Sequence, residues 1–152
     1  MNLNFSTKGN TLKKLKSILK SAEIPATYIF NYKEWNLKRT KLIANIFSEI
    51  KSNKYIVRSS SSQEDTKSSS KAGAFLSVQS VTRENFESSV EKVFRSYGFI
   101  NSDDEVFIQP MLDSVVISGV AFSHDPNTFA PYRVINWNEG PDTALVTGGL
   151  GG

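Results

Sequence analysis

The chain has 152 residues, which suits one ordinary domain, and its 39% apolar and 22% charged residues suffice for a folded core. It contains no cysteine, which excludes disulfides, thiolate metal sites and cysteine nucleophiles within these residues. The net charge of +3 is too small to indicate a nucleic-acid partner. No apolar run approaches the roughly 20 residues that cross a bilayer, and the basic N-terminal stretch lacks the apolar segment of a secretory signal. We therefore expect a cytoplasmic protein that binds neither nucleic acid nor membranes.

Hydrophobic periodicity predicts a mixed α and β chain with hairpins in its last third. The expected elements are, in chain order, a helix over residues 10–21, a strand over 26–30, a helix over about 38–51, strands over 54–58 and 74–78, a helix over about 83–97, and strands over 106–109, 115–123 and 132–137. We expect Ile18 and Leu19 on the buried face of the first helix. Thr82 is expected to cap the third helix, and Gly98 to end it.

Two segments in the first half have the chemistry of phosphate binding. Residues 59–73 contain seven serines and follow Arg58 at a strand end, so their hydroxyls and amides could cradle a phosphate. The alternative for this segment is a low-complexity surface loop. Residues 7–10 place Lys8 and Gly9 before a helix, where the N-terminus favours anions. The alternative there is a helix cap with a solvated lysine.

Two segments in the second half could line a ligand site. In residues 106–112, the strand expected over 106–109 ends in Gln109 and is followed by a proline, which could leave backbone groups open to the edge of a purine ring. An ordinary strand end is the alternative. His124 beside Asp125 is compatible with acid–base or phosphohistidine chemistry. We favour a turn over residues 124–131, because Asp-Pro is a strong turn former and neighbours on a strand point to opposite faces.

Taken in order, these segments resemble the N-terminal nucleotide-binding domain shared by phosphoenolpyruvate synthase and pyruvate phosphate dikinase. The resemblance covers residues 7–126 and extends to residues 146–148. The resembling segments are TKGNTL at 7–12, Pro25, VRSS at 57–60 with Glu64-Asp65 and Ala72-Gly73, IQPM at 108–111, and SGVAFS at 118–123 with Asp125-Pro126.

The resemblance implies an ATP-grasp fold, of which this chain is the first lobe: an α+β unit with a mixed, mostly antiparallel sheet and flanking helices. It implies a phosphotransferase that moves a phosphoryl group from ATP through a phosphohistidine to an acceptor. By position, Lys8, Arg58 and Ser59 would bind phosphates, with Arg58 also catalytic. Ala72, Gly73 and Ala74 would cover the phosphates, and the adenine side would be formed by Gln109, Pro110, Met111 and Leu112.

Several positions depart from this family. Residues 136–140, NWNEG, stand where the family has Gly-Leu-Gly-Glu. This resembles a divergent branch typified by the glutamine kinase of capsule phosphoramidate synthesis, and the two resemblances together imply an acceptor that is either pyruvate or an amide such as glutamine. The context of His124 is not that of the family's phosphohistidine, which we therefore do not assign to it.

The resemblance also implies what lies elsewhere. We expect residues 1–152 to be a partial nucleotide-binding domain, with the second lobe, the Mg²⁺ ligands, the phosphohistidine and the acceptor domain outside this chain. The isolated lobe is expected to be inactive and to self-associate through its uncovered cleft face. The alternative function is an inert binding or regulatory module derived from such a lobe.

Overall fold

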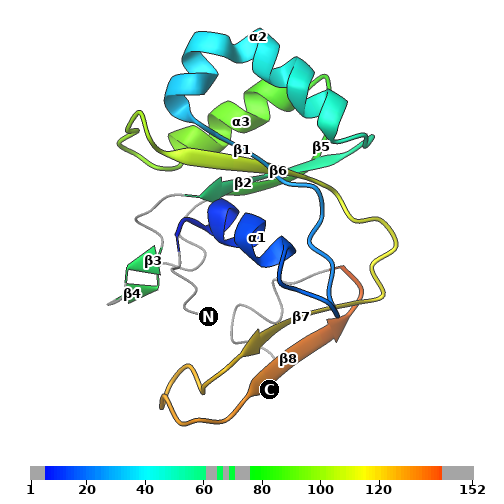
Figure 1. Cartoon of the computed structure of the whole chain (residues 1–152), viewed down its shortest axis with the longest axis vertical. Helices are drawn as coiled ribbons and strands as arrows, with labels where there is room; N and C mark the ends of the chain where they lie inside the picture. The colour runs from blue at the N-terminus through cyan, green and yellow to red at the C-terminus, as the bar shows by residue number, and fades with distance from the viewer. Residues whose placement is uncertain (1–5, 61–64, 67–68, 71–75, 142–152) are drawn as a thin grey trace. The chain divides into compact units, whose positions relative to one another are not determined.

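A computed structural model describes residues 6–60, 65–66, 69–70 and 76–141 (Figure 1). The chain divides into two compact units, Met1–Met111 and Leu112–Gly152. The described residues form an α+β fold with three helices, an antiparallel four-stranded sheet and a hairpin. None of these helices is long and apolar enough to cross a membrane.

The first unit is organised around the four-stranded sheet, whose order is β1-β6-β2-β5. These strands are β1 (Tyr28–Asn31), β6 (Glu105–Pro110), β2 (Tyr55–Ser60) and β5 (Ser77–Val81). The short strands β3 (Asp65–Thr66) and β4 (Ser69–Ser70) pair separately. Every described pairing is antiparallel, so the antiparallel expectation is confirmed, while a mixed sheet is not what these strands form. The late strand β6 lies between β1 and β2, which both come earlier in the chain.

The helices form layers on the two faces of this sheet (Figure 1). Helices α2 (Tyr32–Glu49) and α3 (Phe86–Arg95) cover one face, and α1 (Lys8–Lys16) lies against the other. The core lies under α2 and α3. Its buried members are Phe30, Trp35, Leu42, Ile46, Ile50, Tyr55, Val57, Val81, Phe86, Val90, Val93, Phe94, Val106 and Ile108. Because strand residues alternate between faces, Arg58, Ser60 and Phe107 belong to the face that carries α1.

Two helices differ from the sequence expectation at their ends. Helix α1 ends at Lys16, and Ile18 and Leu19 are each 40% exposed, so the expected buried face is wrong beyond Lys16. Helix α1 instead buries Gly9, near its start. Helix α2 begins before residue 38, because Asn31 and Glu34 form a reciprocal capping box. The expected start coincides with a kink at Lys38, which has non-helical angles.

The segment around α3 also corrects two expectations. Thr82 is not the N-cap; its backbone N–H donates to the Asn85 side chain, and Asn85 occupies the cap position. The buried face of α3 over residues 86–94 is confirmed. Helix α3 ends at Arg95 with Ser96 as its C-cap, so the expected end at residue 97 is two residues too late, and Gly98, with φ +73°, lies after the helix end. The strand expected over 74–78 is β5, at Ser77–Val81; residues 74 and 75 lie outside the described residues.

The second unit is a hairpin of β7 (Ile117–Phe122) and β8 (Val134–Glu139). The expected strands over 115–123 and 132–137 are confirmed with shifted ends. Gly119 faces Trp137 in the register, and a Cβ at this glycine would lie 2.5 Å from the Asn136 carbonyl oxygen. The glycine therefore allows the close approach of the two strands.

Candidate functional site

The start of α1 is attached to the end of β2. The Gly9 N–H donates to the Ser60 hydroxyl oxygen at 2.9 Å, and this contact is buried. A Cβ at Gly9 would lie 3.1 Å from the Ile29 side chain and 3.2 Å from the Ser60 oxygen. Glycine thus lets the first helical turn approach the sheet closely, and Lys8, which precedes it, is held near the end of β2.

A carboxylate joins these two elements to β6. The Glu105 carboxylate accepts from the Thr7 hydroxyl at 2.6 Å and from the Asn10 amide at 3.0 and 3.1 Å. The Ser60 hydroxyl also lies 3.5 Å from it. We call Thr7, Asn10, Ser60 and Glu105 the Glu105 cluster. It places a negative charge, held by neutral donors, beside the N-terminus of α1.

The hydroxyl of Tyr97 bridges the end of β2 and the start of β6. It accepts from the Ser60 N–H at 2.9 Å and donates to the Glu105 carbonyl oxygen. Ser60 and Glu105 are direct register partners, so the hydroxyl lies in the position of a strand-to-strand hydrogen bond. Tyr97 therefore links the region after α3 to the strand ends that carry the Glu105 cluster.

Lys8 and Arg58, the two expected phosphate ligands, come from the elements that meet at this point. Lys8 is the first residue of α1, and both side chains are half-buried. The Arg58 guanidinium carbon lies 5.4 Å from the ring centroid of Phe107, its register partner on β6. The alternation of β2 puts the buried Ser59 side chain on the opposite face, away from Arg58. Ala72, Gly73 and Ala74 lie outside the described residues.

The expected adenine segment already makes internal hydrogen bonds. The Gln109 amide donates to the Thr27 hydroxyl at 2.9 Å and is buried. The Met111 N–H donates to the Lys54 carbonyl oxygen at 2.9 Å, and Pro110 has no N–H to offer. Leu112 belongs to the second unit and is exposed. Gln109 and Glu105 are four residues apart on β6, which is about 13 Å at a strand's rise.

His124 lies in a turn, as the sequence favours. One oxygen of Asp125 accepts from the N–H groups of Asn127 and Thr128 and from the Thr128 hydroxyl. The Thr128 N–H and hydroxyl, and then the Asn127 N–H, lower the pKa of Asp125. His124 is exposed, with Nδ1 3.1 Å from the Ser123 hydroxyl. The Asp125 carboxylate therefore organises the turn.

Sequence reasoning did not identify Glu105 or Tyr97. Glu105 precedes the strand expected at 106–109, and Tyr97 is compatible with an ordinary apolar stripe. The pairing of Thr7 with Glu105 spans 98 positions, so no local pattern reports it. The one available signal is polar residues at strand ends, which is common to many folds.

Within the described part of the chain, no group of three or more His, Cys, Asp or Glu side chains is placed to hold a metal ion. Comparisons with protein-family models, with curated proteins and with solved structures found no match to this chain.

Proposed function

We propose that this chain is the ATP-binding lobe of a phosphotransferase of the phosphoenolpyruvate synthase class. Such an enzyme passes a phosphoryl group from ATP through a phosphohistidine to pyruvate or to an amide such as glutamine. The proposal rests on one observation above all, the hydrogen bond from the Gly9 N–H to Ser60. This bond brings the turn that carries Lys8 to the strand end that carries Arg58.

The charges at this point suit a polyphosphate. A helix N-terminus carries a partial positive charge, and Lys8 stands at the first position of α1. Arg58 adds a planar set of donors that matches phosphate oxygens. In the proposed role Arg58 binds the transferring phosphoryl group and stabilises its developing charge. Mg²⁺ would neutralise the phosphates when ATP is bound, with ligands from other segments of the enzyme.

The α1 face of the sheet also suits the length of a nucleotide. The span of about 13 Å from Glu105 to Gln109 along β6 allows phosphates at one end and a base at the other. Phe107 lies between them on the same face, beneath the Arg58 guanidinium. The base would then be read near Gln109, Pro110, Met111 and the following Leu112.

The alternative function is an inert binding or regulatory module, and two observations favour it. The Gln109 amide and the Met111 N–H are committed to Thr27 and Lys54, which removes two donors from a base. The Glu105 carboxylate is held beside the α1 N-terminus, where it repels a phosphate. A lobe with these contacts could bind a partner or a different ligand and transfer nothing.

A nucleotide titration tests the proposal. Mg·ATP is added to the ¹⁵N-labelled 152-residue chain, and backbone amide shifts are followed by NMR. We expect saturable shifts at Lys8, Gly9, Arg58 and Ser60, with smaller shifts at Met111 and Leu112. Magnesium chloride alone is the control for ionic effects. Shifts spread over exposed lysines without saturation would contradict a nucleotide site.

A transfer assay separates the two functions. The complete enzyme is incubated with ATP labelled in the γ-phosphate, and acid-labile phosphohistidine is measured. Saturable nucleotide binding together with phosphohistidine supports the phosphotransferase. Saturable binding without any labelled protein supports the inert module.

A further inference from the structure

The Glu105 carboxylate, at the start of β6, is bound by residues on both sides of Lys8 and Gly9. The Thr7 hydroxyl donates to it at 2.6 Å, and the Asn10 amide donates to it at 3.0 and 3.1 Å. The Asn10 amide also donates to the Thr7 hydroxyl oxygen at 2.9 Å, which joins the two donors to each other. The first turn of α1 is therefore fixed to β6 by one side chain.

This contact changes how α1 begins. Thr7 occupies the N-cap position of α1, but it makes no side-chain cap hydrogen bond. An N-cap hydroxyl normally accepts from a backbone N–H of the first turn. Here the Thr7 hydroxyl donates to Glu105 instead. The carboxylate thus holds the helix start, while Thr7 does not cap the helix N-terminus, which favours anions.

Glu105 also lies close to the position of Arg58 on the sheet. Glu105 pairs with Ser60, and Phe107, two positions further along β6, pairs with Arg58. Glu105 and Arg58 are therefore diagonal neighbours on the face that carries α1, and such neighbours are about 7–8 Å apart. The side chain that holds the turn of Lys8 thus stands next to the strand position of Arg58.

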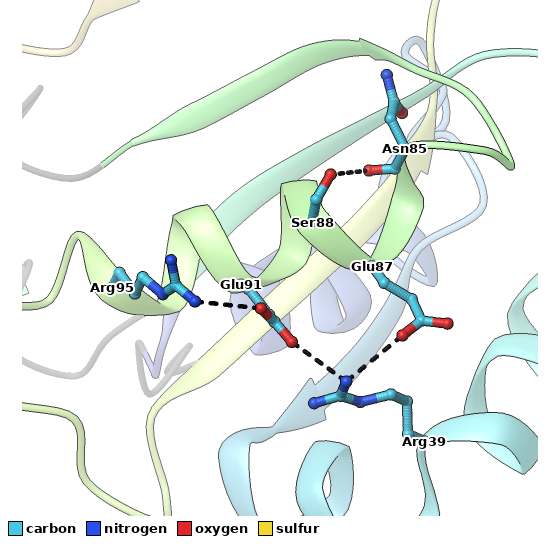
Figure 2. Close-up of polar contacts among 6 residues, drawn as sticks. All are labelled: Arg39, Asn85, Glu87, Ser88, Glu91 and Arg95. Atoms are coloured by element: carbon cyan, nitrogen blue, oxygen red, sulfur yellow. Dashed lines mark hydrogen bonds and ion pairs between the residues drawn. The ribbon is translucent and has the colours of Figure 1, made fainter.

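The hydroxyl and amide donors to Glu105 are neutral, unlike those of the acidic residues on α3. There, Arg39 lies 3.4 Å from Glu87 and 3.1 Å from Glu91 (Figure 2). Arg95 lies 3.3 Å from Glu91. An arginine offsets the charge of a carboxylate, whereas neutral donors orient a carboxylate and leave its charge in place. Glu105 therefore has two opposed effects on a phosphate at the start of α1: it fixes the turn, and its charge repels the anion.

We propose that Glu105 is a positioning residue of the ATP site, which acts through Lys8. By fixing Thr7 and Asn10, it holds the Lys8 ammonium where it binds the phosphates. The role of Glu105 rests on the proposed ATP-binding function. Lys8 contributes to ATP binding only while Glu105 is in place, and the acceptor oxygens of Glu105 are what the site needs, since its charge disfavours a phosphate.

A double-mutant cycle between Glu105 and Lys8 tests this role, with the affinity of the 152-residue chain for Mg·ATP as the measurement. In the original chain, Lys8→Ala is expected to weaken binding about tenfold or more, because a charged hydrogen bond is lost. In the Glu105→Ala background, where Lys8 is no longer held, the same change is expected to weaken binding by about threefold or less. Lys13→Ala, which removes an exposed lysine of the same helix, is the control and should leave the affinity unchanged.

Glu105→Gln separates the position from the charge. Glutamine keeps an acceptor oxygen for Thr7 and Asn10 and carries no charge. We therefore expect Glu105→Gln to bind Mg·ATP at least as tightly as the original chain. Glu105→Ala should bind it about tenfold more weakly, because the contribution of Lys8 is lost. Glu87→Gln, which removes one negative charge from α3, is the charge-matched control.

Asn10→Ala provides the test where Glu105→Ala does not fold. Alanine is the best helix former, so the variant does not weaken α1 itself, but it removes the amide that binds Glu105. We expect it to weaken Mg·ATP binding about threefold or more.

Three results overturn the positioning role while the ATP site stands. These are unchanged affinity in Asn10→Ala, a full effect of Lys8→Ala in the Glu105→Ala background, and affinity in Glu105→Ala equal to or above that of Glu105→Gln. If the original chain shows no saturable binding of Mg·ATP, the proposed ATP site itself is wrong, and the role of Glu105 is wrong with it.

Discussion

The Gly9 N–H and the Ser60 hydroxyl oxygen are 2.9 Å apart, and this hydrogen bond attaches the first turn of α1 to the last residue of β2. The Ser60 hydroxyl contacts both α1 and β6, since it also lies 3.5 Å from the Glu105 carboxylate. The position of Lys8 relative to Arg58 therefore depends on one buried serine.

Ser60→Ala removes the acceptor of the Gly9 N–H and leaves that donor buried. We expect a loss of about 1–3 kcal/mol in the free energy of unfolding, which is the usual range for an unsatisfied buried group. Urea unfolding followed by circular dichroism measures it. The control is Ser48→Ala on the exposed side of α2, expected within about 0.5 kcal/mol of the original chain. Equal stabilities of the two variants would show that the Ser60 contact contributes nothing.

Tyr97→Phe tests the hydroxyl between the strand ends. The ring stays packed against Phe94, with centroids 6.3 Å apart, while the Ser60 N–H and the Glu105 carbonyl oxygen lose their partner. We expect a destabilisation of about 1–3 kcal/mol and faster amide exchange at Ser60. The exposed Tyr132→Phe is the control. Unchanged exchange at Ser60 would mean that the strand ends pair directly without the hydroxyl.

Arg58→Ala tests the proposed phosphate contact. Hydrogen bonds to charged groups contribute about 1.5–3 kcal/mol, so Mg·ATP should bind this chain about tenfold or more weakly. Arg83→Ala is a matched control, because the Arg83 guanidinium carbon also lies over an aromatic ring, 4.6 Å from the centroid of Phe47, which belongs to α2 and not to the α1 face of the sheet. The same affinity in both variants would exclude Arg58 from the site.

In the phosphotransferase proposed above, the same substitution is expected to have a larger consequence. There, Arg58→Ala is expected to slow phosphohistidine formation by about a hundredfold or more, through lost stabilisation of the transition state. His124→Asn is the control, because His124 lies in a turn, and it should leave the label in place. Loss of the phosphoryl label in the His124 variant would reverse the assignment of that residue.

The stability of the turn after β7 is expected to decrease at low pH. The Asp125 pKa is lowered by its bonds to Thr128 and then Asn127. A lowered pKa in the folded state stabilises the turn above the unfolded value of about 3.9, and this contribution is lost as the pH falls through the lowered pKa. The amide shifts of Asn127 and Thr128 should therefore titrate below about pH 3.9. Asp125→Asn removes the titrating group, and a transition that persists in this variant would assign it to another group.

The helix ends show how far local patterns reach. The buried face of α3 follows from apolar spacing, because this is a property of neighbouring residues, whereas the expected cap at Thr82 and the expected end at Gly98 differ from the observed cap at Asn85 and end at Arg95. The start of α2 was also readable in principle, since Asn31 and Glu34 have the spacing of a capping box, but the expected start lay at the kink. The end of α1 could not be predicted from the sequence, because Ile18 and Leu19 are apolar and yet remain exposed in the structure.

The candidate site depends on longer distances along the chain. Lys8 and Arg58 could be singled out as cations at a helix start and a strand end. The contact between α1 and β2 could not be predicted in this way. It is made through Ser60 and Glu105, and the Thr7–Glu105 hydrogen bond joins residues that are 98 positions apart in the sequence. The internal bonds of Gln109 and Met111 likewise depend on Thr27 and Lys54, which no spacing relates to them.

The sequence by itself determined the type and order of the main α and β elements and the turn around Asp125, because periodicity and turn chemistry act between close neighbours. Only the tertiary structure decided that β6 lies between β1 and β2, that Glu105 contacts the start of α1, and that the buried Trp35 N–H has no acceptor among the described residues. These relationships come from packing between distant segments, where burial and the pairing of polar groups select one arrangement among many that the local patterns allow.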